Sequence, residues 1–246
     1  MTANLTIIHT NDLHNHLDDA LASKLRSLKA TAGPNCLLVD AGDAISSGNI
    51  TYKPDGEKIL QAMSDIGYDA MTVGNREFHF SQAGFRAKVC RAAFPVLCAN
   101  VRARDTNTPL PVTPYTAITL SNGCRVAIFG ITVPMITERM LVRKVSAYVF
   151  DDPLQCAKQL VPLLRTECDL LVCLSHIGIA KDRDLAASTP GIDLIIGGHT
   201  HAVLEAGEQV NETLIVQAGS WGRHFSVVSS ELGEGKPQLT AKLVTM

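Results

Sequence analysis

Apolar, strand-like runs alternate along this chain with short polar blocks and with helix-period segments. The runs span residues 5–9, 36–40, 70–73, 95–99, 125–130, 170–174, 194–196 and 214–217. The helix-period segments span residues 20–28, 59–66 and 154–164, where apolar side chains recur at intervals of three and four. Because strands and helices alternate, we expect an α/β fold with largely covered sheets.

Five of the strand-like runs lead directly into side chains that bind metal ions. These side chains are Asp12 and His14, Asp43, Asn75, His176, and His199 with His201, in chain order. In open α/β sheets, ligands bind beyond the carboxyl ends of the strands. Taken singly, the first three blocks read as ordinary capping or turn residues and His176 as a partly buried histidine, whereas the pair His199 and His201 is a stronger signal. Together they predict a metal centre at one rim of the sheets, with donors that suit Mn, Zn, Fe, Co or Ni.

Length and composition favour one globular domain. The chain has 246 residues, of which 46% are hydrophobic, and we expect residues 1–246 to form a single domain. The turn-rich stretch 102–114 reads as a surface loop, and residues 225–243 as a terminal hairpin around the Gly- and Pro-containing segment 233–237. The net charge of −2 gives no reason to expect a general nucleic-acid binder.

Other features predict a cytoplasmic location. No apolar run is long enough to span a bilayer, and the N-terminus lacks the basic and apolar segments of a signal peptide. The 7 cysteines are an odd number without a CxxC pair. We therefore expect reduced thiols, most of them in the core.

The blocks resemble those of the calcineurin-like metallophosphoesterases. The sequence from His9 to His14 and the block from Gly74 to Phe78 look like the catalytic domain of the 5′-nucleotidase and UDP-sugar hydrolase group. The resemblance implies a four-layer α/β/β/α sandwich with two mixed sheets and two divalent metal ions at the carboxyl ends of the strands. It implies that Asp12, His14 and His201 bind the first metal, that Asn75, His176 and His199 bind the second, and that Asp43 bridges the two. Asn11 and Asn100 are weaker candidates for supporting contacts.

The same resemblance implies a reaction. A metal-bridging hydroxide attacks phosphorus in line with the departing oxygen, without a covalent enzyme intermediate. We expect a phosphomonoester substrate such as a 5′-nucleotide. Two alternatives stay open, namely a phosphodiesterase acting on cyclic nucleotides or other small diesters, and a metal-binding regulatory protein with little activity.

The third block departs from the family pattern at two positions. The usual block reads Gly-Asn-His-Glu-Phe-Asp, but this chain has Arg76 in place of the histidine and His79 in place of the aspartate. A guanidinium does not release its proton at working pH, although its planar donor fork suits phosphate oxygens. Histidine has an ordinary pKa of about 6.5 and can supply a proton. We therefore expect Arg76 to clamp the phosphoryl group and His79 to protonate the leaving oxygen. The alternative is a site that keeps its metals and has lost most activity.

Substrate contacts beyond the metals are harder to derive from the sequence. Asn75 and Arg76 of the third block are expected to meet the phosphate. Trp221, the single tryptophan, stands near the expected rim and is a candidate for stacking on a base or another substrate ring, and Arg223 beside it is a candidate for contact with a phosphate. We expect no C-terminal nucleotidase substrate-binding domain within these residues, because the sequence ends soon after the expected catalytic core. The oligomeric state does not follow from the sequence.

Overall fold

The structure, a computed structural model, describes residues 3–105, 107–232 and 237–246. Its α-helices are α1 (Asp19–Ala32), α2 (Lys58–Ile66), α3 (Gln82–Val89), α4 (Pro153–Arg165) and α5 (Ile179–Ser188). Its strands are β1 (Ala3–Thr10), β2 (Cys36–Asp40), β3 (Ala70–Thr72), β4 (Val96–Leu97), β5 (Val101–Ala103), β6 (Tyr115–Thr119), β7 (Arg125–Thr132), β8 (Tyr148–Phe150), β9 (Leu170–His176), β10 (Leu194–Gly197), β11 (Glu208–Val210), β12 (Thr213–Val216), β13 (His224–Leu232) and β14 (Gln238–Thr245). Two short 3-10 helices, η1 (Gly33–Asn35) and η2 (Leu141–Lys144), complete the described elements.

Two six-stranded sheets form the centre of the molecule. The first has the order β14-β13-β1-β2-β3-β4, and the second has the order β11-β12-β10-β9-β7-β6. Strands β1 to β4 run parallel to one another, whereas β13 and β14 pair antiparallel. In the second sheet β7, β9, β10 and β12 are parallel, and both edge strands are antiparallel. Both sheets are therefore mixed, as expected.

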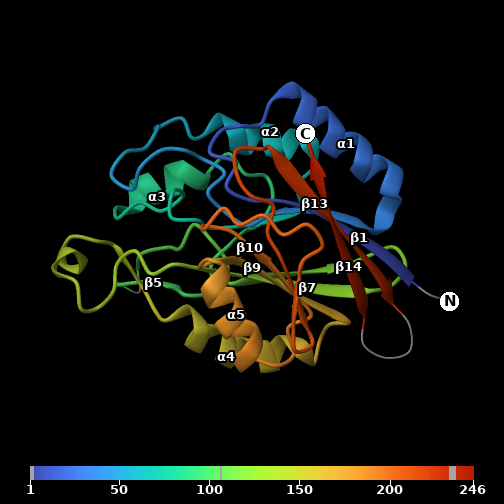
Figure 1. Ribbon diagram of the computed structural model, residues 1–246. Helices are drawn as coiled ribbons and strands as arrows, with labels where there is room; N and C mark the ends of the chain where they lie inside the picture. Colours follow the sequence, from blue (N-terminus) through green and yellow to red (C-terminus); the bar gives the residue numbers. More distant parts are fainter. Residues whose placement is uncertain (1–2, 106, 233–236) are drawn as a thin grey trace.

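Helices cover the outer face of each sheet, so the fold has four layers (Figure 1). Strand β1 shows the division: Ile7 packs with Val126 and Val172 of the second sheet, whereas Ile8 faces the side of α1 and α2. The other outer face packs against α4 and α5, where Phe129 and Leu171 meet Val161 and Leu185. The expected α/β/β/α sandwich is confirmed, with one apolar core between the sheets and one beneath each helical layer.

Several local predictions match the structure and others are wrong. Strand β2 has the expected bounds, and α1, α2 and α4 contain the expected helical segments. The expected strand 95–99 is only two residues long, and the expected loop 102–114 begins inside β5. The terminal hairpin is present as β13 and β14, with its expected turn at 233–236 outside the described residues. Helices α3 and α5 are not evident from the sequence, because α3 places Lys88 and α5 places Asp182 on a buried face.

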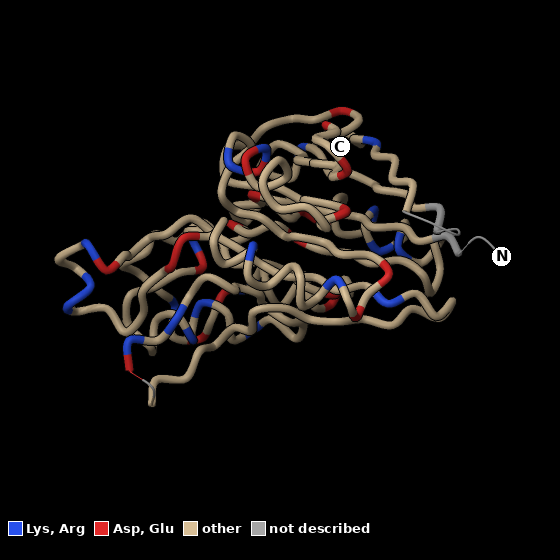
Figure 2. The backbone as a smooth tube through the Cα atoms, turned by 90° about the horizontal axis from the view of Figure 1, so that it is seen from below, with Lys and Arg blue, Asp and Glu red and all other residues tan. Residues whose placement is uncertain are grey.

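The surface charges and the cysteine thiols add little to the prediction of function. No helix within the described ranges is long and apolar enough to cross a membrane. Basic and acidic residues are interspersed along the backbone rather than gathered by sign (Figure 2). All seven cysteines are free thiols, five of them buried and Cys90 exposed.

Candidate metal centre

The candidate ligands come from strand ends of both sheets. Asp12 and His14 follow β1, Asp43 follows β2 and Asn75 follows β3, all in the first sheet. His176 is the last residue of β9, and His199 and His201 follow β10 in the second sheet. Parallel strands end at a common edge, so these loops converge where the two sheets face each other. The convergence expected from the sequence is present in the structure.

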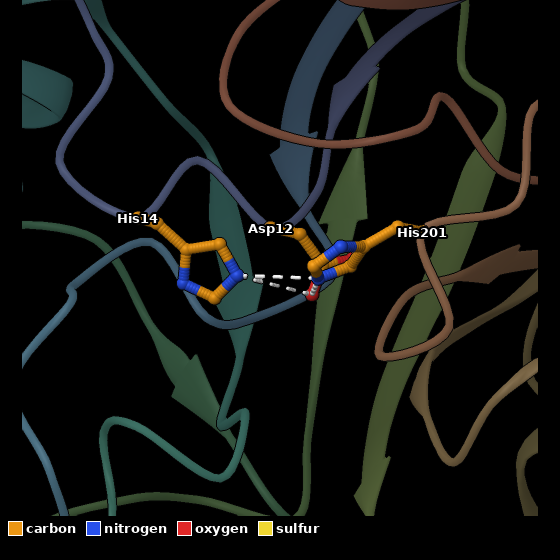
Figure 3. Close-up of side chains that lie close together, drawn as sticks. All are labelled: Asp12, His14 and His201. Carbon is orange, nitrogen blue, oxygen red and sulfur yellow. Dashed lines mark hydrogen bonds and ion pairs between the residues drawn. The ribbon is translucent and has the colours of Figure 1, made fainter.

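One group of potential ligands contains Asp12, His14 and His201. The Nε2 atoms of His14 and His201 lie 3.3 Å apart. The Asp12 Oδ1 atom lies 3.4 Å from His201 Nε2 and 3.9 Å from His14 Nε2. Figure 3 shows the three side chains pointing toward one another. One carboxylate and two imidazoles at these separations form a donor set for a divalent ion of the first transition series.

A second group contains Asp12, Asp43 and His176, all buried. The Nδ1 atom of His176 lies 2.7 Å from the carbonyl oxygen of Ala41, to which it donates when protonated. The opposite ring atom, Nε2, is buried without a hydrogen-bond partner, 3.5 Å from Asp43 Oδ1 and 4.0 Å from Asp12 Oδ1. An unpaired imidazole nitrogen that faces two carboxylates fits a bound cation, and its other nitrogen has the carbonyl contact typical of metal-binding histidines.

Asn75 and His199 lie beside these groups. The Oδ1 atom of Asn75 is 3.0 Å from Nδ1 of His199, and the rings of His199 and His176 are 5.3 Å apart. The backbone N–H of His199 donates to the carboxylate of Asp12. All seven candidate ligands are thus connected by short contacts. The residue common to both groups is Asp12, so the role of Asp43 as the bridge stays a prediction.

The backbone at the ligands is in an unusual conformation. Among the described residues other than glycine, eight have a positive φ, and five of these are candidate ligands: Asp12 (51°), His14 (45°), Asp43 (54°), His199 (75°) and His201 (54°). A left-handed conformation is uncommon for residues with a Cβ atom. It costs of order 1–3 kcal/mol per residue and gathers at functional sites. This concentration is independent support for a site at these strand ends.

Three glycines allow the loops to approach one another closely. A Cβ atom on Gly74 would lie 2.3 Å from both the backbone nitrogen and Oδ1 of Asp43. One on Gly42 would lie 2.6 Å from the nitrogen of Gly74, and one on Gly198 would lie 2.8 Å from His176 Nδ1. Real Cβ atoms do not make contacts this short, so a side chain at these positions would displace the candidate ligands.

Buried polar side chains hold the ligand loops in place. The sequence assigned no role to Glu77 and only a supporting role to Asn11 and Asn100. Glu77 accepts hydrogen bonds from the backbone nitrogens of Asp43 (2.9 Å), Gly74 (2.8 Å) and Ile45 (3.2 Å). Asn11, expected to give support, donates to Asp12 Oδ2 at 2.8 Å. Asn100, the other such candidate, contacts Thr132 and Asp151 instead of a ligand.

The sequence predicts no role for Lys88 of α3. Its buried Nζ donates to the carbonyl oxygens of Gly48, Arg76 and Phe78, at 2.8, 2.5 and 3.1 Å. It therefore ties the third block to the loop that follows β2. The available signal is its spacing: Phe85, Lys88 and Val89 share one helical face, which is the buried one.

The electrostatics of the cluster favour a positive charge between the carboxylates. Burial opposes protonation of His176, but the carboxylates of Asp43 and Asp12 raise its pKa to about 9. Burial alone would raise the pKa of Asp43, yet contact with His176 lowers it. Burial lowers the pKa values of His14 and His199, which favours the neutral form that binds metals. A divalent ion can replace the proton that this field would otherwise hold on His176.

The two altered positions of the third block lie in different surroundings. The backbone N–H of Arg76 donates to Asp43 Oδ1 at 2.7 Å, and its Nε lies 3.9 Å from Asp43 Oδ2. His79 is buried, and its Nδ1 accepts from the backbone nitrogen of Ser81 at 3.0 Å. Its ring stacks on Phe80 and forms a T-shaped contact with the ring of Tyr52. The structure brings Arg76 to the candidate ligands, whereas the described contacts of His79 are with its own loop, with Tyr52 and with the start of α3.

Trp221 and Arg223 lie at the edge of the cluster. The backbone N–H of Trp221 donates to the carbonyl of Asp12, and its ring centroid is 6.0 Å from that of His201. The Arg223 guanidinium lies over the Trp221 ring, 4.7 Å from its centroid. The tryptophan is 42% exposed. Trp221 therefore borders the first ligand group, and Arg223 lies against the Trp221 ring.

Comparison with known proteins agrees with this geometry. Residues 5–203 match the model of the calcineurin-like phosphoesterase family. The chain is 33% identical to the trifunctional nucleotide phosphoesterase protein YfkN of Bacillus subtilis, over 94% of this chain and 18% of that protein. It is 29% identical to 5′-nucleotidase of Rattus norvegicus, over 96% of this chain and 44% of that protein.

A solved structure shows the same fold. The 5′-nucleotidase precursor from Thermus thermophilus superimposes with a TM-score of 0.81 at 26% identity, over 99% of this chain and 55% of that one. The chain thus spans about half the length, or less, of these relatives. From the extent of the family match, together with the fold, we conclude that the chain belongs to the calcineurin-like phosphoesterase family.

Proposed function

We propose that this chain is a dimetal phosphohydrolase that cleaves phosphomonoesters, with 5′-nucleotides as the preferred class. The observation that carries the proposal is the meeting of Asp and His side chains from both sheets around buried carboxylates. Relatives named as a nucleotide phosphoesterase and a 5′-nucleotidase support the substrate class. In the reaction, water adds to phosphorus, the ester P–O bond breaks, and the departing alcohol takes a proton.

The ligand assignment has two parts. We assign Asp12, His14 and His201 to one divalent ion, with Asn75, His176 and His199 on the other. Asp43 is the bridging ligand of this assignment. Two ions held by these residues would supply a hydroxide near neutral pH and would polarise a phosphoryl oxygen. Glu77 and Asn11 hold Asp43 and Asp12 in place through the hydrogen bonds described above.

Arg76 is the proposed phosphate clamp. Its side chain is 42% exposed, while its Nε is buried without a hydrogen-bond partner and lies beside Asp43. A guanidinium there offers two or more N–H donors to the equatorial phosphoryl oxygens, which gain negative charge in the transition state. Asn75, the preceding residue, is the second proposed contact to the same phosphoryl group.

The proposed role of His79 as the proton donor has weaker support. Its Nδ1 is engaged with Ser81, and burial lowers its pKa below the ordinary value, which disfavours the protonated form. These contacts favour a role in shaping the third block. Trp221 borders the first ligand group and Arg223 lies over its ring, and we retain both as proposed substrate contacts.

The test is a substrate and metal matrix. The protein is reconstituted with Mn, Zn, Co or Ni and assayed on 5′-AMP, p-nitrophenyl phosphate, bis-p-nitrophenyl phosphate and pyrophosphate. The proposal expects turnover of the two monoesters. Turnover of the diester alone would support the phosphodiesterase alternative. Stoichiometric metal binding without turnover of any substrate would support the regulatory alternative.

Variants of Arg76 and His79 distinguish the proposed phosphate clamp from the proposed proton donor. Arg76→Ala is expected to reduce kcat/KM on both monoesters by roughly 100-fold, in the range found when one transition-state donor is removed. If His79 protonates the leaving group, His79→Ala will impair 5′-AMP far more than p-nitrophenyl phosphate, because p-nitrophenolate leaves without a proton. Equal effects on the two esters would exclude that role.

A further inference from the structure

A groove of about 880 Å³ opens beside the candidate ligands. One wall contains Asn15, which follows the ligand His14 directly in the chain. Most of the remaining lining comes from the segment from Tyr52 to Ile59, which leads into α2. The rings of Tyr52 and of His79 in the third block form a T-shaped contact, at 5.0 Å between centroids. The groove therefore runs between two of the loops that build the proposed site.

The lining of the groove suits a flat, amphipathic ligand. Leu17, Ile59 and Ala62 contribute apolar surface, and the 40% exposed ring of Tyr52 lies at the rim. Lys53 forms an ion pair with Glu57, at 2.7 Å between Nζ and Oε2, so part of the charge is neutralised within the wall. Ligand pockets are typically of about 300–1,000 Å³ with mostly apolar walls and a few polar groups. The groove falls within this size range, and beside its apolar residues the wall also carries the charged side chains of Asp55, Lys58 and Arg91.

A smaller hollow adjoins the groove at Asn15 and Leu17. It has about 290 Å³ and is bordered by His16 and Trp221. One face of its tryptophan is covered by the Arg223 guanidinium. The larger groove is therefore the better site for a bulky group, and its Tyr52 is the better stacking surface.

We propose that this groove binds the nucleoside part of the substrate, with the base against Tyr52. The inference rests on the proposed function for the phosphate position and adds the site of the leaving group. Every base has an apolar face that stacks on an aromatic ring. The ribose hydroxyls then lie toward the polar part of the wall, where Asn15 and Asp55 offer hydrogen-bonding groups. Tyr52 is in this account a specificity-determining residue.

The experiment compares Tyr52→Ala and Tyr52→Phe with the control Tyr115→Ala. Tyr115 of β6 is 42% exposed, like Tyr52, but does not line the groove. The first readout is the ratio of kcat/KM on 5′-AMP to that on p-nitrophenyl phosphate. The second is the inhibition constant of adenosine, which lacks the phosphate, against p-nitrophenyl phosphate hydrolysis. Tyr52→Ala is expected to lower the ratio and weaken adenosine inhibition by about tenfold each, in line with the contribution of one stacked base.

The remaining variants are measured with the same two readouts. Tyr52→Phe keeps the ring and should stay within about twofold of the wild type in both readouts. Tyr115→Ala should change neither readout. Ala62→Phe, which fills the groove from α2, should reproduce the loss seen in Tyr52→Ala.

The outcomes separate this inference from the proposed function. Adenosine inhibition that is absent, or that is equal in wild type and Tyr52→Ala, would overturn the groove proposal. Adenosine inhibition that depends on Tyr52, in a protein that does not hydrolyse 5′-AMP, would support the groove and refute the nucleotidase function. If p-nitrophenyl phosphate is not hydrolysed either, calorimetric titration with adenosine gives the same decision on the groove.

Discussion

The buried ammonium of Lys88 links two loops of the proposed site, and its removal should weaken both the fold and metal binding. Its Nζ donates to three backbone carbonyl oxygens, those of Gly48, Arg76 and Phe78. Lys88→Met keeps the length of the side chain and removes all three donors. The carbonyl groups are then left without their present partner inside the protein.

The size of the effect follows from these contacts. A hydrogen bond to a charged group contributes about 1.5–3 kcal/mol, so three contribute roughly 5–9 kcal/mol. The neutral methionine side chain does not carry the cost of burying an ammonium, which is several kcal/mol and offsets part of this loss. The difference is a loss of about 3–5 kcal/mol, similar to breaking a buried ion pair. For a chain of this size that corresponds to a fall in Tm of roughly 10 °C.

The assay is urea and thermal unfolding at pH 7, with Lys158→Met as the control. Lys158 is exposed on α4, and its substitution should change the free energy of unfolding by less than about 0.5 kcal/mol. Metal affinity of Lys88→Met should fall by about 10- to 100-fold, because the loop of the third block is no longer fixed. Equal unfolding free energies and equal metal affinities for the two variants would refute this reasoning.

Two further predictions come from other buried contacts. Gly74→Ala should abolish binding of at least one metal ion while the protein stays folded by circular dichroism, because the new Cβ would collide with Asp43; metal content equal to the wild type would contradict the proposed geometry. Burial raises the pKa of Asp182 to about 7, so the unfolded chain ionises first and the metal-free fold loses stability as pH rises from about 4 to 7. The loss from Asp182 is at most about 4 kcal/mol; urea unfolding at pH 5 and pH 7.5 should show a larger loss in the wild type than in Asp182→Asn, which keeps the buried Glu77 whose pKa is also raised to about 7, and equal pH dependence would contradict it.

Much of the fold could be predicted because the core strands are mostly apolar. Strand β2 is buried at all five positions, four of them apolar before Asp40, and the predicted strand has the same bounds. The ligand residues could be found for a related reason, since polar residues directly after buried parallel strands meet at one edge. Helices α3 and α5 could not be found, because each buries a charged residue, Lys88 or Asp182, on the face that should be apolar.

The details of the site depend on backbone conformation and on side-chain contacts, which the spacing of apolar residues in the sequence does not predict. The left-handed backbone at Asp12 places its carboxylate in both ligand groups, and nothing in the order of residues indicates this. His79 contacts Ser81, the N-cap of α3, so its surroundings depend on a helix that the sequence pattern does not indicate. The family resemblance shows Arg76 and His79 altered together, and the structure shows that their contacts differ.

The central claim is that seven side chains from two sheets hold two divalent ions. The most direct test is a calorimetric titration of the metal-stripped protein with Mn²⁺, supported by elemental analysis of the dialysed product. We predict two ions per chain for the wild type, and one for His14→Ala, which removes a ligand of the first group only. A wild-type stoichiometry of one or zero would contradict the account.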